Sequence, residues 1–208
     1  MRFRKDVLCG LLAAVMCSAL VLNGCSSGGK ISPGENGTET EKEQGKTAET
    51  ADGFGEENLG NFTMKDLNDE TYTPEMFADY DLTMVNVFTT WCTPCVREIP
   101  DLEKIYQEMK EDGVGVIGIV LDAVDGSGET DGDAVEKARL LAEKTGASYP
   151  FLIPDKGYLN GRLAGIQAVP ETFFVDKDGN IVGETYSGSR SFEDWMGIVE
   201  KELEEVAR

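Results

Sequence analysis

Two cysteines three residues apart, Cys92 and Cys95, stand where the chain changes from one periodicity to another. The residues before them, 84–90, form a continuous apolar run typical of a buried strand. The residues after them, up to about Lys110, repeat apolar side chains at helical spacing. A Cys-x-x-Cys pair at such a strand-to-helix junction is typical of a redox couple rather than of a metal site. This junction constrains both the fold and the chemistry of the chain.

The chain contains no histidine and five cysteines. The absence of histidine excludes Ser-His-Asp and Cys-His catalysis, His-ligated zinc or copper, and c-type haem attachment. Only Cys92 and Cys95 lie in the body of the chain, and two thiolates fall short of a four-coordinate zinc site. We therefore expect no metal and no cofactor other than a redox-active disulfide between Cys92 and Cys95.

The chain is strongly acidic, with 19 Lys and Arg against 39 Asp and Glu, a net charge of −20. Such a surface repels polyphosphates and anionic headgroups, so we expect no nucleic-acid partner.

The N-terminus resembles a secretory signal. Arg2, Arg4 and Lys5 precede an almost unbroken apolar run over residues 7–22. The run ends in Leu-Asn-Gly-Cys, which resembles the lipobox of bacterial lipoproteins and makes Cys25 the expected lipidation site. We expect a lipoprotein signal peptide over 1–24 that is cleaved before Cys25. The lipid attached to Cys25 would then anchor the body to the cell membrane, outside the cytoplasm. An uncleaved signal anchor is the alternative, and the short apolar run argues against a stable span.

Composition divides the rest of the chain in two. Residues 25–59 are rich in Gly, Ser, Thr, Glu and Lys, and cannot bury enough apolar surface to offset the entropy of ordering. We expect a flexible acidic and Gly-rich tether there and a folded domain over 60–208, which we expect to be a monomer.

The body alternates strand and helix patterns. Residues 62–64 and 71–73 flank a turn and predict an N-terminal β-hairpin. Further strands are predicted over 114–121, 149–153, 172–175 and 181–184, and further helices over 133–144 with Asp133 as cap, 158–164, and from Ser191 onward. The terminal helix carries a core stripe that includes Trp195. This order predicts an α/β fold with a central mixed sheet and helices on both faces.

The start of a helix stabilises an anion, because its first N–H groups are unpaired and its dipole is positive there. Cys92 is therefore the candidate nucleophile, and Cys95, one turn further on, would resolve the mixed disulfide. Thr93 and Pro94 form the first turn, where the missing N–H of proline costs nothing. Trp91 would provide either an apolar wall beside Cys92 or a core anchor.

Glu98 follows Cys95 by three residues, so both project from one side of the helix. A partly buried carboxylate near two sulfurs would oppose thiolate formation and could exchange protons with Cys95. Pro100 removes one helical hydrogen bond and should kink the helix.

The motif Trp91-Cys92-Thr93-Pro94-Cys95 with Glu98 and Pro100, followed by a Val169-Pro170 pair that opens the strand to Asp176, resembles the TlpA/ResA branch of thioredoxin-like proteins. The resemblance covers residues 60–205 and implies a thioredoxin-like fold in which residues 133–153 are the αβ insertion of the TlpA type.

The resemblance also implies roles for individual residues and for partners. It implies Cys92 and Cys95 as the redox pair, Glu98 as the nearby acid, and Pro170 as a cis-proline opposite the dithiol. There, the backbone around Val169 would receive an extended substrate. Members of this family are membrane-anchored thiol-disulfide oxidoreductases, often acting on apocytochrome c and recharged by a membrane electron donor of the CcdA type. Thr93 replaces the glutamate of ResA-type members, which weakens the transfer of their cytochrome specificity.

Four functions remain open. The first is a reductase of disulfide-containing proteins, and the second is a disulfide-forming oxidase with the same residues, because the spacing of the cysteines does not set the reduction potential. The third is a peroxiredoxin-like peroxidase, since Thr89 and Cys92 have the Thr-x-x-Cys spacing of that family. The fourth is a metallochaperone of the Sco type, against which the absent histidine counts.

Overall fold

Two fully buried strands set the architecture. Every residue of β3 (Leu82–Phe88) and of β4 (Val114–Val120) is buried. Strands that are apolar on both faces must be covered on both sides, as is usual for parallel pairs. The two strands pair in parallel at the middle of a seven-stranded sheet of order β2-β1-β5-β4-β3-β6-β7. The computed structural model describes residues 58–208, and all statements on the fold refer to these residues.

The remaining strands extend the sheet on both sides of this centre. On one side β5 (Phe151–Ile153) is parallel to β4 and antiparallel to β1 (Met64–Asp66), which forms the predicted hairpin with β2 (Thr71–Tyr72). On the other side β6 (Glu171–Asp176) and β7 (Ile181–Ser187) are antiparallel. The predicted mixed sheet and its N-terminal hairpin are confirmed.

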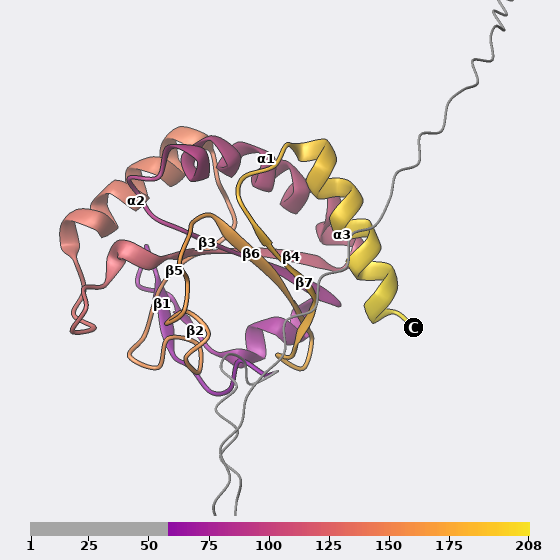
Figure 1. Cartoon of the computed structure of the whole chain (residues 1–208), viewed down its shortest axis with the longest axis horizontal. Coiled ribbons are helices and arrows are strands. Elements are labelled where there is room, and N and C mark those ends of the chain that lie inside the picture. Colours follow the sequence, from indigo (N-terminus) through magenta and orange to yellow (C-terminus); the bar gives the residue numbers. More distant parts are fainter. Residues whose placement is uncertain (1–57) are drawn as a thin grey trace, which may run out of the picture. The chain divides into compact units, whose positions relative to one another are not determined.

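The two faces of the sheet carry different layers, as Figure 1 shows. Helices α1 (Thr93–Met109), α2 (Gly132–Thr145) and α3 (Phe192–Val206) contribute Leu102, Ala138 and Trp195 to one apolar cluster. The 3-10 helix η1 (Pro74–Asp79) contributes Phe77 to the cluster on the other face. Two further 3-10 turns, η2 (Lys110–Asp112) and η3 (Leu121–Ala123), flank β4. Among the described residues, the second face is covered by η1 and by loops, so the predicted helices on both faces are α-helices on one face and a 3-10 helix on the other.

The helix predicted over residues 158–164 is wrong. Tyr158, Leu159 and Asn160 have φ values of 49°, 50° and 55°, so the segment turns in the left-handed sense. This conformation costs about 1–2 kcal/mol for each residue other than glycine. Leu159 and Leu163 of this segment are 1% and 3% exposed, and burial of a leucine contributes about 1.5–3 kcal/mol. The burial of two leucines against the sheet is therefore of the same size as the cost of the three left-handed residues and offsets it.

Several predicted boundaries also differ from the structure, and two of them have a clear physical reason. Helix α2 is capped by Asp131, whose carboxylate accepts the N–H groups of Asp133 and Ala134, and not by Asp133. Leu59, which the composition placed in the tether, is 1% exposed, and its N–H donates to the carbonyl of Gly179. The packed body therefore includes Leu59.

The predicted signal peptide over 1–24, the lipidation site Cys25 and nearly all of the predicted tether lie outside the described residues. Within the described part of the chain, none of the helices has the length and apolar character that crossing a membrane requires.

Candidate active site

The two cysteines lie at the start of α1. Cys92 is the N-cap residue of the helix, and its Sγ accepts the N–H of Cys95 at 3.3 Å. The two sulfurs are joined in a disulfide, and the residues are 5% and 1% exposed. Because unpaired N–H groups and the positive end of the helix dipole meet at Cys92, reduction of the bond would leave the more stable thiolate there.

The residues around the disulfide differ in exposure. Thr93 and Pro94 form the exposed first turn of α1, and Pro100 lies within the helix on its exposed side. Helix α1 continues past Pro100 to Met109. Trp91 is 73% exposed, so its alternative role as a core anchor is wrong. Its role as a wall beside Cys92 stays a prediction.

The strand β6 brings a second element to the disulfide. The peptide bond between Val169 and Pro170 is cis, and the carbonyl oxygen of Val169 lies 3.6 Å from the Sγ of Cys92. In the disulfide this sulfur carries no hydrogen, so the approach is a contact; a reduced Cys92 thiol would be able to donate to the same oxygen. The carbonyl of Pro170 accepts the N–H of Gly188 at 2.9 Å. The structure therefore brings Val169 and Pro170 to Cys92, 77 residues away in the chain.

Glu98 lies buried beneath this site, with 2% of its surface exposed. Its Oε1 accepts the backbone N–H of Arg190 at 2.7 Å and the indole Nε1–H of Trp195 at 2.8 Å. Its Oε2 accepts one longer bond, 3.3 Å, from Nδ2 of Asn86. Burial raises the pKa of the Glu98 carboxyl, while these donors and the charge of Arg190 act in the opposite direction. A carboxyl with a raised pKa is a better proton acceptor than an exposed glutamate, and can return the proton later.

The donors that hold Glu98 are themselves fixed. The amide of Asn86 also donates to Oγ1 of Thr172 at 2.9 Å, and both residues are buried in the sheet. The guanidinium of Arg190 lies 5.0 Å from the ring centroid of Trp195, and its Nη1 donates to the carbonyl of Gly188 at 2.8 Å. The loop between β7 and α3 thus binds Pro170 through one backbone N–H and Glu98 through another.

Sequence reasoning missed three of these residues as parts of the site, namely Asn86, Trp195 and Arg190. The interior of β3 offered one local indication, because an amide within an otherwise apolar strand must find hydrogen-bond partners. Trp195 was expected only as part of a core stripe. Its bond to Glu98 joins residues 97 apart in the chain, and no local pattern encodes it.

Comparisons with known proteins agree with this geometry. The model of the AhpC/TSA family matches residues 56–183. Thiol-disulfide oxidoreductase ResA of Bacillus thuringiensis (strain Al Hakam) is 33% identical over 117 residues, which are 56% of this chain and 61% of that protein. Thiol:disulfide interchange protein DsbE of Haemophilus influenzae is 32% identical over 129 residues, 62% of this chain and 63% of that protein. The matches thus span about three fifths of the length of these curated relatives.

A solved structure supports the fold. The thiol:disulfide interchange protein of Chlorobium tepidum TLS, a thioredoxin family protein, superposes with a TM-score of 0.56 at 25% identity. The superposition covers 69% of this chain and 93% of that one. The thioredoxin-like α/β fold and the resemblance to ResA-type proteins, both inferred from the sequence, are confirmed.

Proposed function

Because this chain belongs to the AhpC/TSA family, we propose that it is a thiol-disulfide oxidoreductase that reduces disulfides of other proteins through Cys92 and Cys95. The observation that carries the proposal is the Cys92–Cys95 disulfide at the start of α1, above a buried carboxyl with a raised pKa. The similarity to ResA and DsbE supports the same class of reaction.

The reaction begins with the reduced pair. The thiolate of Cys92 attacks one sulfur of the substrate disulfide; an S–S bond forms to Cys92, and the other substrate sulfur leaves as a thiolate and takes up a proton. The thiol of Cys95 then loses its proton, and its thiolate attacks Sγ of Cys92. The second substrate thiolate leaves and takes up a proton from solvent, and the protein retains the disulfide. Two electrons pass from the dithiol to the substrate, which ends as a dithiol.

Glu98 serves the second half of this sequence. It follows Cys95 by one turn of α1, and its Oε1 is already occupied by two N–H donors. The proton from Cys95 therefore goes to Oε2, the oxygen with only one long hydrogen bond, from Asn86. Because burial raises the pKa of the Glu98 carboxyl, its protonated form is more stable than that of an exposed glutamate, and the carboxyl can hold this proton and release it when the disulfide is reduced again.

The substrate would bind beside the cis peptide bond. The carbonyl of Val169 lies next to Cys92, and an extended substrate segment can pair with backbone groups of this kind, as in strand addition. Trp91, which is exposed and precedes Cys92 in the chain, would supply apolar contact. The disulfide-containing substrates would include apocytochrome c, with the reservation that Thr93 stands where ResA-type proteins carry glutamate.

The cellular location of the protein and the source of its electrons complete the proposal. The signal over 1–24 and Cys25 support an extracytoplasmic lipoprotein. We infer from the family resemblance that it is recharged by a membrane donor of the CcdA type, and we propose that it acts as a monomer. Metabolic labelling with an alkyne fatty acid should tag the wild-type protein, and Cys25→Ser should abolish the label. Equal labelling of wild type and Cys25→Ser, or no labelling of wild type, would contradict lipid anchoring at Cys25.

Insulin reduction tests the activity. With dithiothreitol as electron supply, the full-length protein should accelerate the precipitation of insulin chains, and Cys92→Ser should abolish the acceleration. The matched control Thr93→Ser, in the same helical turn, should retain it. Wild-type turnover by Cys92→Ser would contradict the mechanism.

Equilibration with glutathione separates the two directions. A reductase should have a reduction potential well below that of the glutathione buffer, since 30 mV corresponds to about 1.4 kcal/mol for a two-electron couple. A potential close to that of strong disulfide-forming oxidases, about −120 mV, would favour the alternative of an oxidase.

A further inference from the structure

A cavity of about 350 Å³ lies at the opposite end of α1 from the disulfide. Tyr106, which lines it, follows Cys92 by 14 residues, or about 20 Å along the helix axis at 1.5 Å per residue. The volume is within the range of small-molecule sites, about 300–1,000 Å³. The walls come from the β1–β2 hairpin, η1, α1, α2, β4 and the start of β5. No residue of the proposed dithiol site lines this cavity.

Four tyrosines form much of the lining, namely Tyr72, Tyr80, Tyr106 and Tyr149. The rings of Tyr106 and Tyr149 meet edge to face with centroids 6.3 Å apart. The ring of Tyr80 lies directly over Gly115, where an added Cβ would come within 2.5 Å of the ring carbon Cδ2. Glycine at this position therefore allows the Tyr80 ring to lie against the sheet.

The cavity carries negative charge and no positive charge. Its lining includes three carboxylates, Asp66, Glu70 and Asp79, but no lysine or arginine. Burial, followed by the charges of Asp66 and Glu70, raises the pKa of Tyr72 to about 12. The tyrosine thus stays a neutral phenol, and its environment is negative.

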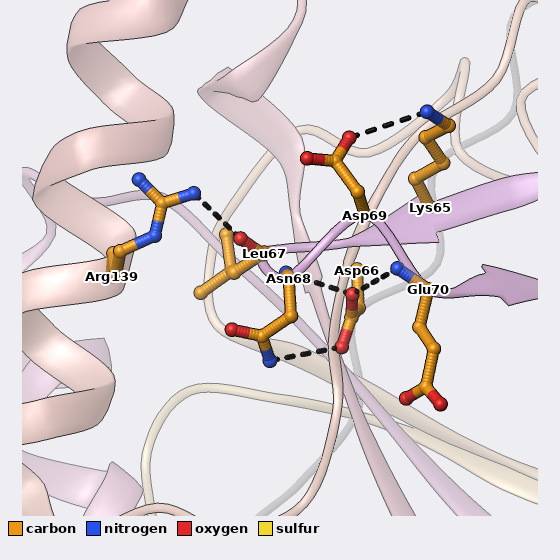
Figure 2. A network of polar contacts seen from close by, with 7 residues as sticks. All are labelled: Lys65, Asp66, Leu67, Asn68, Asp69, Glu70 and Arg139. Carbon is orange, nitrogen blue, oxygen red and sulfur yellow. Dashed lines mark hydrogen bonds and ion pairs between the residues drawn. The ribbon is translucent and has the colours of Figure 1, made fainter.

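The acidic rim of the cavity is held in place by a network of hydrogen bonds, shown in Figure 2. The carboxylate of Asp66, buried in the β1–β2 turn, accepts the backbone N–H groups of Asn68 at 2.8 Å and of Glu70 at 2.9 Å. Arg139 of α2 donates to the carbonyl of Leu67 at 2.6 Å and so ties the same turn to the helix layer. The rim is therefore formed in advance of any ligand, which lowers the entropic cost of binding.

Aromatic rings and carboxylates, in a lining that has no lysine or arginine, suit one class of ligand. The face of a phenol ring attracts cations, and tyrosine-lined cages bind quaternary ammonium groups in particular. One ring of this set already lies near an ammonium, since Nζ of Lys110 is 5.8 Å from the Tyr106 ring centroid. We propose that the cavity between the β1–β2 hairpin, η1 and α1 binds a small free quaternary ammonium compound.

Calorimetric titration of the full-length protein with choline chloride, in a sodium phosphate buffer, tests the proposal. Saturable binding at one site is expected. Two side chains should matter: Tyr106→Leu should weaken binding about 5- to 30-fold through the lost ring, and Asp79→Asn about 2- to 5-fold through the lost charge. The matched controls Tyr158→Leu and Asp178→Asn, which do not line the cavity, should leave the affinity unchanged.

The neutral isostere 3,3-dimethylbutan-1-ol separates charge recognition from simple apolar burial, and it should bind at least about tenfold more weakly than choline. Phosphocholine separates a free cation from a headgroup, because Glu70 and Asp79 on the exposed rim would repel its phosphate. Equal affinity for choline and its neutral isostere, or no loss in Asp79→Asn together with none in Tyr106→Leu, would overturn the proposal. Tighter binding of phosphocholine than of choline would overturn the assignment of a free cation. Insulin reduction by both cavity variants should remain normal.

Discussion

Replacement of Trp195 by phenylalanine tests the role of Glu98. The indole Nε1–H donates to Oε1 of Glu98 at 2.8 Å in a site where both residues are buried. Phenylalanine keeps an aromatic ring but has no donor. A hydrogen bond to a charged group contributes about 1.5–3 kcal/mol, and this bond favours the ionised carboxylate. Its loss should lower the ionisation constant of Glu98 by about 10- to 100-fold, since 1.36 kcal/mol corresponds to a factor of ten.

The assay is the pH dependence of disulfide exchange. If Glu98 must be ionised to take the proton of Cys95, the acid limb of the rate profile should move to higher pH by about 1–2 units in Trp195→Phe. Circular dichroism establishes that the variant is folded under the assay conditions. The other tryptophan of the chain gives a matched control: Trp91 is 73% exposed, and Trp91→Phe should leave the limb in place. Superimposable profiles for folded Trp195→Phe and wild type would refute the proton-accepting role of Glu98.

Two further predictions concern stability. Because the folded-state pKa of Glu98 is raised above its ordinary value of 4.5, its contribution to stability is fully present below pH 4.5 and is lost as the pH rises through the raised value. In urea unfolding, the free energy of unfolding of Glu98→Gln minus that of wild type should therefore be more positive at pH 8 than at pH 4. A difference that does not change with pH would contradict this. Gly183 has φ +64°, and a Cβ there would overlap the buried carboxylate of Glu202. Gly183→Ala should cost at least about 1 kcal/mol more than Gly146→Ala, whose φ of +74° is similar but whose Cβ meets open space. Equal losses would show that Glu202 moves aside.

The sequence was sufficient to predict the centre of the fold because local patterns encode it. The buried strands β3 and β4 follow from continuous apolar runs, and the start of α1 follows from Cys92 and Pro94. The segment over 158–164 could not be predicted in this way. Its apolar spacing favours a helix, but Gly157 and Gly161 weaken that preference, and burial against the sheet determines the left-handed turn that forms instead.

The candidate site was predictable only along α1. Cys92, Cys95 and Glu98 follow one another within two turns of a single helix, so their spacing placed them together. The donors that determine the acidity of Glu98 come from β3, from α3 and from the loop before α3. These contacts form only when the sheet and the helices assemble, and they depend on which strands become neighbours. Asn86 was the exception with a local indication, as a polar residue inside a buried strand.

A trapping experiment in the native host tests the central claim, that Cys92 attacks the substrate and Cys95 resolves the mixed disulfide. In Cys95→Ser the second step is blocked, so the protein should accumulate as covalent adducts that dithiothreitol releases. Mass spectrometry should find the linkage at Cys92 and identify the substrate proteins. The account predicts adducts of Cys95→Ser and none of Cys92→Ser. Adducts that accumulate at Cys95 in Cys92→Ser, with none at Cys92 in folded Cys95→Ser, would contradict it.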